Sequence, residues 1–223
     1  YENISAANGS YGDDLLIGTH GGVTLNGGHG EDKIVGGNGP DVLISLSDGR
    51  EPPIYQEYDP KEDDPDNEID PNTRTHFPDQ PIEADDILEG GEGADIFRFV
   101  VLINGKRDII LRHVEDDRTI DWGGVAGEND EVHDHWVERL GNDMILDFDR
   151  EEGDHIEIMG HTVDVYDVRH IDTDDDGVLD STVLYIQSNQ GSNGGAHNLD
   201  KLGTVTALGA LLTQEDYTVS KGN

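Results

Sequence analysis

The fold of this chain is decided near its start, by four consecutive blocks of nine residues that read GSYGDDLLI (9–17), GTHGGVTLN (18–26), GGHGEDKIV (27–35) and GGNGPDVLI (36–44). The last two match the nonapeptide G-G-x-G-x-D-x-U-x, in which U is a large aliphatic residue, and the first two keep its frame while losing some letters. Self-similarity at a short fixed period is typical of a solenoid. The spaced glycines and aspartates predict that this solenoid is loaded with metal.

Each letter of the repeat has a physical role. Glycines at the first, second and fourth places let the backbone turn tightly, so that carbonyl oxygens converge on one point. The sixth-place carboxylate brings negative charge to that point, and calcium takes about 6–8 oxygen ligands at roughly 2.3–2.6 Å. The eighth residue is expected to point into a thin core shared by successive turns. These residues are Leu16, Leu25, Ile34 and Leu43.

The blocks resemble those of the RTX, or haemolysin-type, calcium-binding family, whose fold is a parallel β-roll. The resemblance implies that two consecutive blocks make one coil, so that blocks two apart share an edge of the roll. Asp14 would then pair with Asp32 on one edge, while Asp41 would face Val23 on the other. Because a valine side chain cannot ligate an ion, the Val23 site is expected to be weak or built differently.

The pattern returns later in the stretch ADDILEGGEGADIFRFV, where Asp86 and Asp95 hold the sixth place. Residues 90–98 form a full block and residues 81–89 half of one, and Asp86 follows Asp41 by a whole number of nines. We therefore expect the roll to resume in register, with Asp86 on the edge of Asp32 and Asp95 on the edge of Asp41. The alternative is a tandem glycine-rich loop without metal.

Further ligands are expected after the repeats. The stretch DMILDFDREEGDHIEI (143–158) resembles the strand and turn that follow the roll in serralysin proteases, which implies ligation by Asp147, Asp149 and Asp154. The alternative for these acids is that they cap a hairpin turn.

A second acidic string, DTDDDGVLD (172–180), reproduces the first nine places of an EF-hand loop. The expected twelfth-place Glu is replaced by Val183, and the flanking segments look like strands. A calcium-binding hairpin loop is therefore favoured over an EF-hand. The complete set of predicted metal ligands, backbone carbonyls included, is Gly9, Tyr11, Asp14, Gly28, Gly30, Asp32, Gly37, Gly39, Asp41, Asp86, Gly91, Gly93, Asp95, Asp147, Asp149, Asp154, Asp172, Asp174, Asp176, Val178 and Asp180.

Composition agrees with a chain that needs cations. With 50 acidic and 14 basic side chains the formal charge is -36, so the compact metal-free state repels itself. Only 33% of the residues are hydrophobic, and we expect several Ca²⁺ ions to replace part of the missing core. Such a surface disfavours nucleic acid, and no apolar run approaches the roughly 20 residues of a membrane span.

Outside the repeats the chain reads as all-β. Residues 46–81 are rich in proline and acid and are predicted to form a long loop that leaves the roll. Short strands are expected at 96–103, 108–114, 143–148, 155–159, 162–168 and 182–187. We therefore expect a short parallel β-roll in residues 1–100, followed by a β-rich calcium-binding and secretion domain in residues 101–223.

The stretch from His113 to Asp143 holds a second kind of candidate site. His133 and His135 would share one face of a strand, which suits a transition-metal pair, and Trp136 suits sugar contact. The alternative is that these side chains serve packing or partner contact. The chain has neither the Gly-x-Ser-x-Gly elbow of a serine hydrolase nor the His-Glu-x-x-His motif of a zincin.

The sequence thus predicts a secreted, extracellular module that is not itself an enzyme. Its folding would be driven by extracellular calcium, and it would serve the secretion and stabilisation of a larger protein. Expected partners are calcium ions, an upstream domain of the same protein or a second copy of the chain, and the type I secretion apparatus that the resemblance implies. Two alternatives remain: an adhesin or surface-layer module that self-associates or binds sugar with calcium, and a small metal-dependent enzyme or carbohydrate-binding domain within residues 96–200.

Overall fold

The computed structural model of the chain describes residues 5–47, 85–105, 112, 135–137, 139–160, 163–188 and 200–220. Its strands form two large sheets and one small one. The six-stranded sheet has the order β1 (Ala6–Asn8), β3 (Thr24–Asn26), β5 (Val42–Leu46), β7 (Ile96–Val101), β11 (His155–Gly160) and β15 (Tyr217–Ser220). The seven-stranded sheet has the order β12 (Val163–Ile171), β13 (Ser181–Ser188), β14 (Asp200–Ala207), β10 (Gly141–Ile145), β6 (Ile87–Glu92), β4 (Lys33–Asn38) and β2 (Leu15–Ile17). The small antiparallel sheet pairs β8 (Ile103–Gly105) with β9 (His135–Val137).

Successive strands of the repeat region alternate between the two large sheets, which makes the predicted parallel β-roll. Within each sheet, Ala6 pairs with Thr24, Leu15 with Lys33, and Thr24 with Val42, all in parallel. Each residue therefore pairs with the residue 18 positions further along the chain. The hydrogen bonds from backbone N–H groups to carboxylates in the next coil also join residues 18 apart. Two nonapeptides therefore make one coil.

The roll resumes in register after the long insertion. β4 pairs with β6 and β5 with β7, both in parallel, with Lys33 opposite Ile87 and Val42 opposite Ile96. Hydrogen bonds between these coils join residues 54 apart, which is a multiple of nine. The prediction drawn from the spacing of the aspartates is confirmed.

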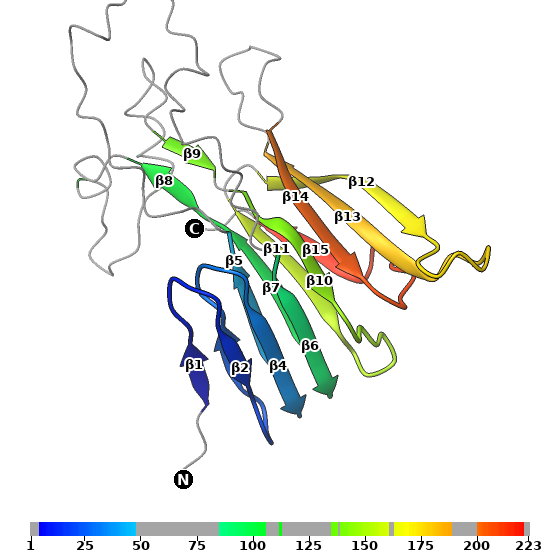
Figure 1. The fold of residues 1–223 in the computed structure, drawn as a ribbon, viewed down its shortest axis with the longest axis horizontal. Coiled ribbons are helices and arrows are strands. Elements are labelled where there is room, and N and C mark those ends of the chain that lie inside the picture. Colours follow the sequence, from blue (N-terminus) through cyan, green and yellow to red (C-terminus); the bar gives the residue numbers. More distant parts are fainter. Residues whose placement is uncertain are drawn as a thin grey trace, which may run out of the picture.

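Both sheets continue past residue 100. β10 lies in parallel between β6 and β14, and β11 lies in parallel between β7 and β15. The hairpin β12–β13 then extends the seven-stranded sheet antiparallel to β14. Figure 1 shows this order, from β1 and β2 at one end of the roll to β12 and β13 at the other. The division into two domains at residues 100 and 101 stays a prediction.

The expected strands at 96–103, 143–148, 155–159, 162–168 and 182–187 correspond to β7, β10, β11, β12 and β13, with ends that differ by a few residues. β14 and β15 were not anticipated, because their sequences lack the alternation of large apolar and polar residues. Apart from Arg112, Ser47 and Leu46, the strand expected at 108–114 and the acidic loop expected at 46–81 lie outside the described residues.

The core lies between the two sheets and is built on the eighth place of the repeat. Leu25 is 4% exposed, while Ile34 and Leu43 are fully buried in one apolar cluster that draws on both sheets. Burying each such side chain stabilises the fold by about 1.5–3 kcal/mol. Phe97 and Phe99 of β7 enlarge the same cluster, and Leu16 packs against it from the first coil. The predicted inward direction of the eighth residue is confirmed.

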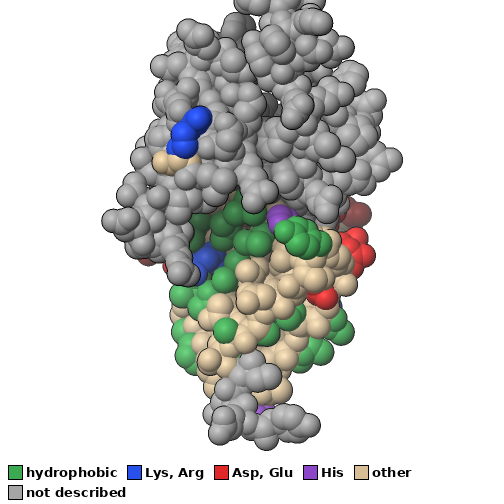
Figure 2. Space-filling model, turned by 90° about the vertical axis from the view of Figure 1, so that its left-hand side faces the viewer, with side chains coloured by type: hydrophobic (Ala, Val, Ile, Leu, Met, Phe, Trp, Pro, Cys, Tyr) green, Lys and Arg blue, Asp and Glu red, His purple; other side chains and the backbone are tan. Residues whose placement is uncertain are grey.

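The first coil forms an end of the roll with an apolar surface. Leu15 and Ile17 flank the inward Leu16 in β2 and are 64% and 63% exposed, and Tyr11 stacks on His29 with ring centroids 5.1 Å apart. Figure 2 looks at the molecule from this side, and its described surface is mostly apolar side chains together with the side chains classed as other and backbone, with acidic side chains toward the margins. No helix among the described residues is long and apolar enough to cross a membrane.

Near the other end, an ion pair joins two turns of the roll. Arg150, in the turn between β10 and β11, donates to both carboxylate oxygens of Asp216 and to the carbonyl of Leu211. Asp216 is 4% exposed and also accepts hydrogen bonds from the backbone and hydroxyl of Thr213. The Arg150 guanidinium lowers the pKa of Asp216 to about 2. The ion pair therefore links the turn before β11 to the residue before β15, which is the last strand of the six-stranded sheet.

Candidate metal centre

The sixth-place carboxylates form two ladders, one on each edge of the roll. In each rung, the Oδ1 atom of one coil accepts a hydrogen bond from the backbone N–H at the sixth place of the coil before it. In the first ladder, Asp14 donates to Asp32 and Asp32 donates to Asp86, both at 2.8 Å. The pairing of Asp14 with Asp32, and the return of Asp86 to the same edge, are therefore as expected.

The second ladder runs along the opposite edge and begins without a carboxylate. The N–H of Val23 donates to Asp41 Oδ1, and the N–H of Asp41 donates to Asp95 Oδ1, both at 2.8 Å. Val23 is 9% exposed, and its side chain offers the rung only apolar atoms. The structure thus places Asp41 opposite Val23 as expected, and this ladder has one acid fewer than the first.

The other carboxylate oxygen of each ladder aspartate is buried without a hydrogen-bond partner. Asp32 and Asp41 are 2% and 1% exposed, and Asp86 and Asp95 are fully buried. In all four, Oδ2 has no donor. An unsatisfied buried polar group costs about 1–3 kcal/mol, and more when it is charged. Cations bound beside these four sixth-place oxygens would supply the missing partners.

The glycines leave space for these oxygens. A Cβ atom on Gly27 would lie 2.2 Å from Asp32 Oδ2, and one on Gly36 or Gly90 would lie 2.4 Å from Oδ2 of Asp41 or Asp95. Only glycine fits beside the carboxylate at the first place of these blocks. The predicted turn glycines also have positive φ, between 95° and 138°: Gly28, Gly30, Gly37, Gly39, Gly91 and Gly93. The carboxylates and carbonyls available there are hard oxygen donors, which suit calcium.

Burial sets the electrostatics of the ladders. It raises the pKa of Asp32 to about 6 and that of Asp86 to about 7, and it raises the pKa of Asp41 and Asp95 as well. Hydrogen bonds from the backbone of the preceding coil oppose this shift but do not overcome it. The metal-free roll therefore disfavours its own ionised carboxylates, and a bound cation would remove that penalty.

Asp143 extends the first ladder and was not predicted from the sequence. It is fully buried, and its Oδ1 accepts a hydrogen bond from the N–H of Asp86 at 3.0 Å. The two residues are 57 apart, which is not a multiple of nine, so a search by period passes over it. The signal that would have found it is local, because Asp143-Met144-Ile145-Leu146 repeats the D-x-U-x half of the nonapeptide.

Asp154 extends the second ladder in the same way, and Asp147 lies beside it. Asp154 accepts hydrogen bonds from the N–H groups of Asp95 at 2.9 Å and Asp149 at 2.8 Å. Asp147 accepts hydrogen bonds from the N–H groups of Gly90 and Gly91, both at 2.9 Å. Three of these four hydrogen bonds come from the neighbouring coil, and β10 and β11 lie in different sheets, so the carboxylates do not cap a hairpin turn. Their ligation of metal stays a prediction. Asp149 accepts from the N–H of Glu151.

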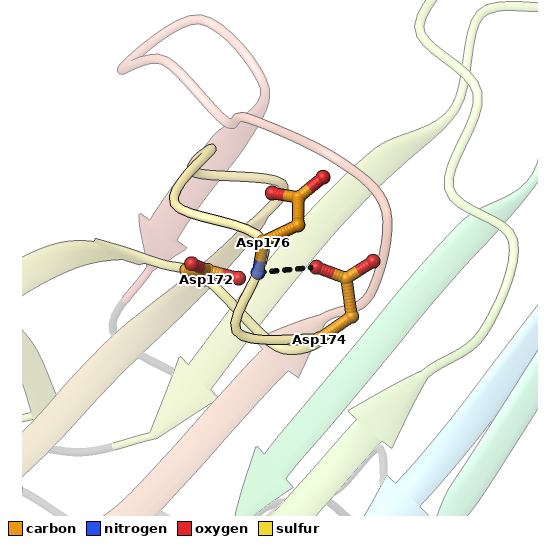
Figure 3. A group of neighbouring side chains, drawn as sticks. All are labelled: Asp172, Asp174 and Asp176. Carbon is orange, nitrogen blue, oxygen red and sulfur yellow. Dashed lines mark hydrogen bonds between the residues drawn. The ribbon is translucent and has the colours of Figure 1, made fainter.

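The acidic loop between β12 and β13 forms a separate cluster. One carboxylate oxygen from each of Asp172, Asp174 and Asp176 lies within 4.8 Å of the others. Figure 3 shows the three side chains around the loop, with Asp174 accepting a hydrogen bond from the N–H of Asp176 at 3.1 Å. Asp180 instead accepts from the hydroxyls of Thr173 and Ser181. The loop thus brings together three of its four predicted carboxylates.

The histidine and tryptophan candidates are not tested by this structure. His133 lies outside the described residues, and the described part of His135 and Trp136 is the backbone of β9.

The fold and these ladders define a β-roll that binds calcium. Comparison with known proteins agrees: residues 8–43 and 83–98 match the RTX calcium-binding nonapeptide repeat in four copies. The chain therefore carries RTX repeats, a calcium-binding structural module whose ligand is Ca²⁺.

One solved structure that resembles the chain is the solution structure of the AlgE6R3 subunit from the Azotobacter vinelandii mannuronan C5-epimerase. The sequences are 21% identical, the match covers 94% of this chain and 80% of that one, and the TM-score is 0.40. No curated protein matches the chain.

Proposed function

We propose that this chain is a folding module whose β-roll forms when extracellular calcium binds, and that it thereby serves the secretion and stabilisation of a larger protein. The observation that supports the proposal most directly is the set of four buried Oδ2 atoms without donors, on Asp32, Asp41, Asp86 and Asp95. A core that depended on apolar packing alone would not bury four carboxylates between its coils.

The physical mechanism is ligand-linked folding. Without calcium, the formal charge of -36 and the buried acids oppose compaction. Extracellular calcium modules bind at about 10⁻⁴–10⁻³ M, so they are empty at the submicromolar calcium of a cell interior and loaded at millimolar calcium outside. A site with an affinity of about 0.1 mM contributes about 1.4 kcal/mol at 1 mM calcium, and several sites add. The chain would be loose and exportable inside the cell and folded after export.

Three groups of residues would hold the ions. The first ladder offers the rungs Asp14–Asp32 and Asp32–Asp86, and the second offers Asp41–Asp95, with Asp147 and Asp154 beside its last block. Glycine carbonyls of the turns would complete each shell. The β12–β13 loop offers the third group, Asp172, Asp174 and Asp176. All three groups consist of oxygen donors, and calcium is the ion that such flexible all-oxygen sites prefer.

Circular dichroism on the isolated chain tests the proposal. At pH 8 the β signal should disappear in calcium-free buffer and return in millimolar calcium, with magnesium a poor substitute because it demands a tighter octahedral shell. Protein stripped of calcium on a chelating resin and then reloaded is the sample to use. Identical spectra before and after stripping would refute calcium-driven folding.

A further inference from the structure

Three Asn–Gly pairs lie in the repeat part of the roll, and the next coil holds the glycine of each pair. The pairs are Asn8–Gly9 at the end of β1, Asn26–Gly27 at the end of β3 and Asn38–Gly39 at the end of β4. The glycine N–H donors and their carbonyl acceptors are Gly9 and Asn26 at 2.7 Å, Gly27 and Ile44 at 3.0 Å, and Gly39 and Glu92 at 2.6 Å. Because each acceptor belongs to the following coil, these hydrogen bonds exist only while the coils are stacked.

An asparagine that precedes glycine is open to attack by its own main chain, because glycine has no Cβ to hinder the approach of its nitrogen. The glycine nitrogen gives up its proton to solvent and bonds to the asparagine Cγ, and the side-chain nitrogen leaves as ammonia. Water then opens the cyclic imide at one of its two carbonyls, which yields either aspartate or isoaspartate. The net reaction consumes one water and releases one ammonia, and it requires neither an enzyme nor a metal.

The stacked roll blocks this reaction at all three pairs. A glycine N–H that donates to the next coil keeps its proton, and the strand backbone cannot turn to bring that nitrogen onto Cγ. Two of the side chains are also held: Asn26 Oδ1 accepts from the N–H of Gly28, and Asn38 Nδ2 donates to Glu92, both at 3.2 Å. The reaction must therefore wait until the coils separate, and its rate follows the fraction of open molecules.

The roll cannot accommodate the isoaspartate product. At Asn26 it would add one carbon atom to the main chain directly before Gly27. That position has no spare room, since a Cβ on Gly27 would lie 2.2 Å from Asp32 Oδ2. Asn26 also pairs with Ile44 in the parallel ladder of β3 and β5, and an inserted backbone atom would shift this register. Register decides which side chains face the core, so a modified coil would no longer stack.

We propose that Asn8, Asn26 and Asn38 are modification sites whose deamidation is controlled by calcium. Bound ions keep the coils stacked and the three asparagines intact, and loss of calcium starts an irreversible reaction that removes the ability of the module to refold. This inference rests on the proposed calcium-driven folding, which supplies the stacked and open states. It goes beyond that function because time spent without calcium leaves a covalent record in the chain.

Peptide mapping by mass spectrometry on the whole chain tests the proposal. Calcium-stripped and calcium-loaded samples are kept at pH 8, where base promotes loss of the glycine proton, and the deamidated fraction at Asn8, Asn26 and Asn38 is followed with time. Each site should react more slowly in calcium by about tenfold or more. The same two buffers with concentrated urea should give equal rates, which controls for a direct effect of the ion on the chemistry.

Readdition of calcium then measures the consequence. Stripped wild type should recover less β signal in circular dichroism the longer it has been kept. The triple variant with Asn8→Gln, Asn26→Gln and Asn38→Gln should recover fully, because glutamine must close a larger ring and cyclises far more slowly. If that variant does not fold, the wild-type deamidation rates alone decide.

Equal deamidation rates with and without calcium, in samples whose β signal does depend on calcium, would overturn the proposal and leave the proposed function standing. Full recovery of a wild type that has deamidated would overturn the loss of refolding. Slow rates in both samples, together with a β signal that stripping leaves unchanged, would instead refute calcium-driven folding itself.

Discussion

Without calcium, acidification should stabilise this protein over a range where acid destabilises most others. Burial raises the pKa of Asp86 from 3.8 to about 7, so between these values the folded carboxyl retains a proton that the unfolded chain has released. The unfolding free energy of the metal-free protein therefore falls as pH rises through this window. At about 1.36 kcal/mol per pKa unit, ionising Asp86 alone costs the folded state about 4 kcal/mol by pH 8. Asp32 and Asp154, with pKa values raised to about 6, act in the same direction.

The folded fraction of calcium-stripped protein, read from the β signal in circular dichroism between pH 5 and pH 8, reports this pH dependence of stability. Stability should be greatest at pH 5 without calcium, while in saturating calcium it should fall on acidification because protons compete with the ion. Asp86→Asn should flatten the metal-free slope, and the exposed Asp164→Asn should leave it unchanged. Metal-free stability that rises from pH 5 to pH 8, or a slope that Asp86→Asn does not alter, would refute the reasoning.

Three further changes test individual features of the roll. Val23→Asp should add a carboxylate opposite Asp41 and one bound calcium ion by isothermal titration, whereas Val23→Asn should add none. Gly36→Ala places a Cβ 2.4 Å from Asp41 Oδ2 and 2.5 Å from the carbonyl oxygen of Gly90. This substitution should lower the free energy of unfolding by about 1–3 kcal/mol and weaken calcium binding. The control Gly12→Ala, with open space around the new Cβ, should change neither. Arg150→Gln should lower the melting temperature at pH 7, and the difference from wild type should shrink as pH falls from 3.8 toward 2, because Asp216 becomes protonated there. Equal melting temperatures at pH 7 would show that the Arg150 ion pair does not stabilise the roll.

The sequence was most informative where the period of nine is unbroken. The eighth-place leucines and isoleucines and the sixth-place aspartates follow from a repeat in which every letter has a steric or electrostatic reason. The register across the insertion followed as well, because Asp32 and Asp86 are separated by a multiple of nine. A solenoid tolerates such an insertion, since each coil contacts only its neighbours and a loop between coils leaves those contacts intact.

Prediction was weaker where coils are built without complete nonapeptides. β10 and β11 contact the repeats at separations of 57 and 59 residues, so only the short D-x-U-x signal marks Asp143 as a ladder residue. β14 and β15 have weak alternation, and their place in the sheets depends on contacts with β10 and β11 that no local pattern encodes. In the β12–β13 loop, Asp180 accepts hydrogen bonds from the hydroxyls of Thr173 and Ser181 instead of joining the other three carboxylates. The spacing of the acids does not predict this, because nearby hydroxyls compete for the Asp180 carboxylate.

The most direct test of calcium between the coils is a crystal of the chain grown in millimolar calcium, with diffraction data collected at a long wavelength where calcium scatters anomalously. We predict anomalous peaks beside Oδ2 of Asp32, Asp41, Asp86 and Asp95, the four buried oxygens that lack donors. Density maps that show only water or empty space beside all four atoms, in crystals that contain ample calcium, would contradict the account.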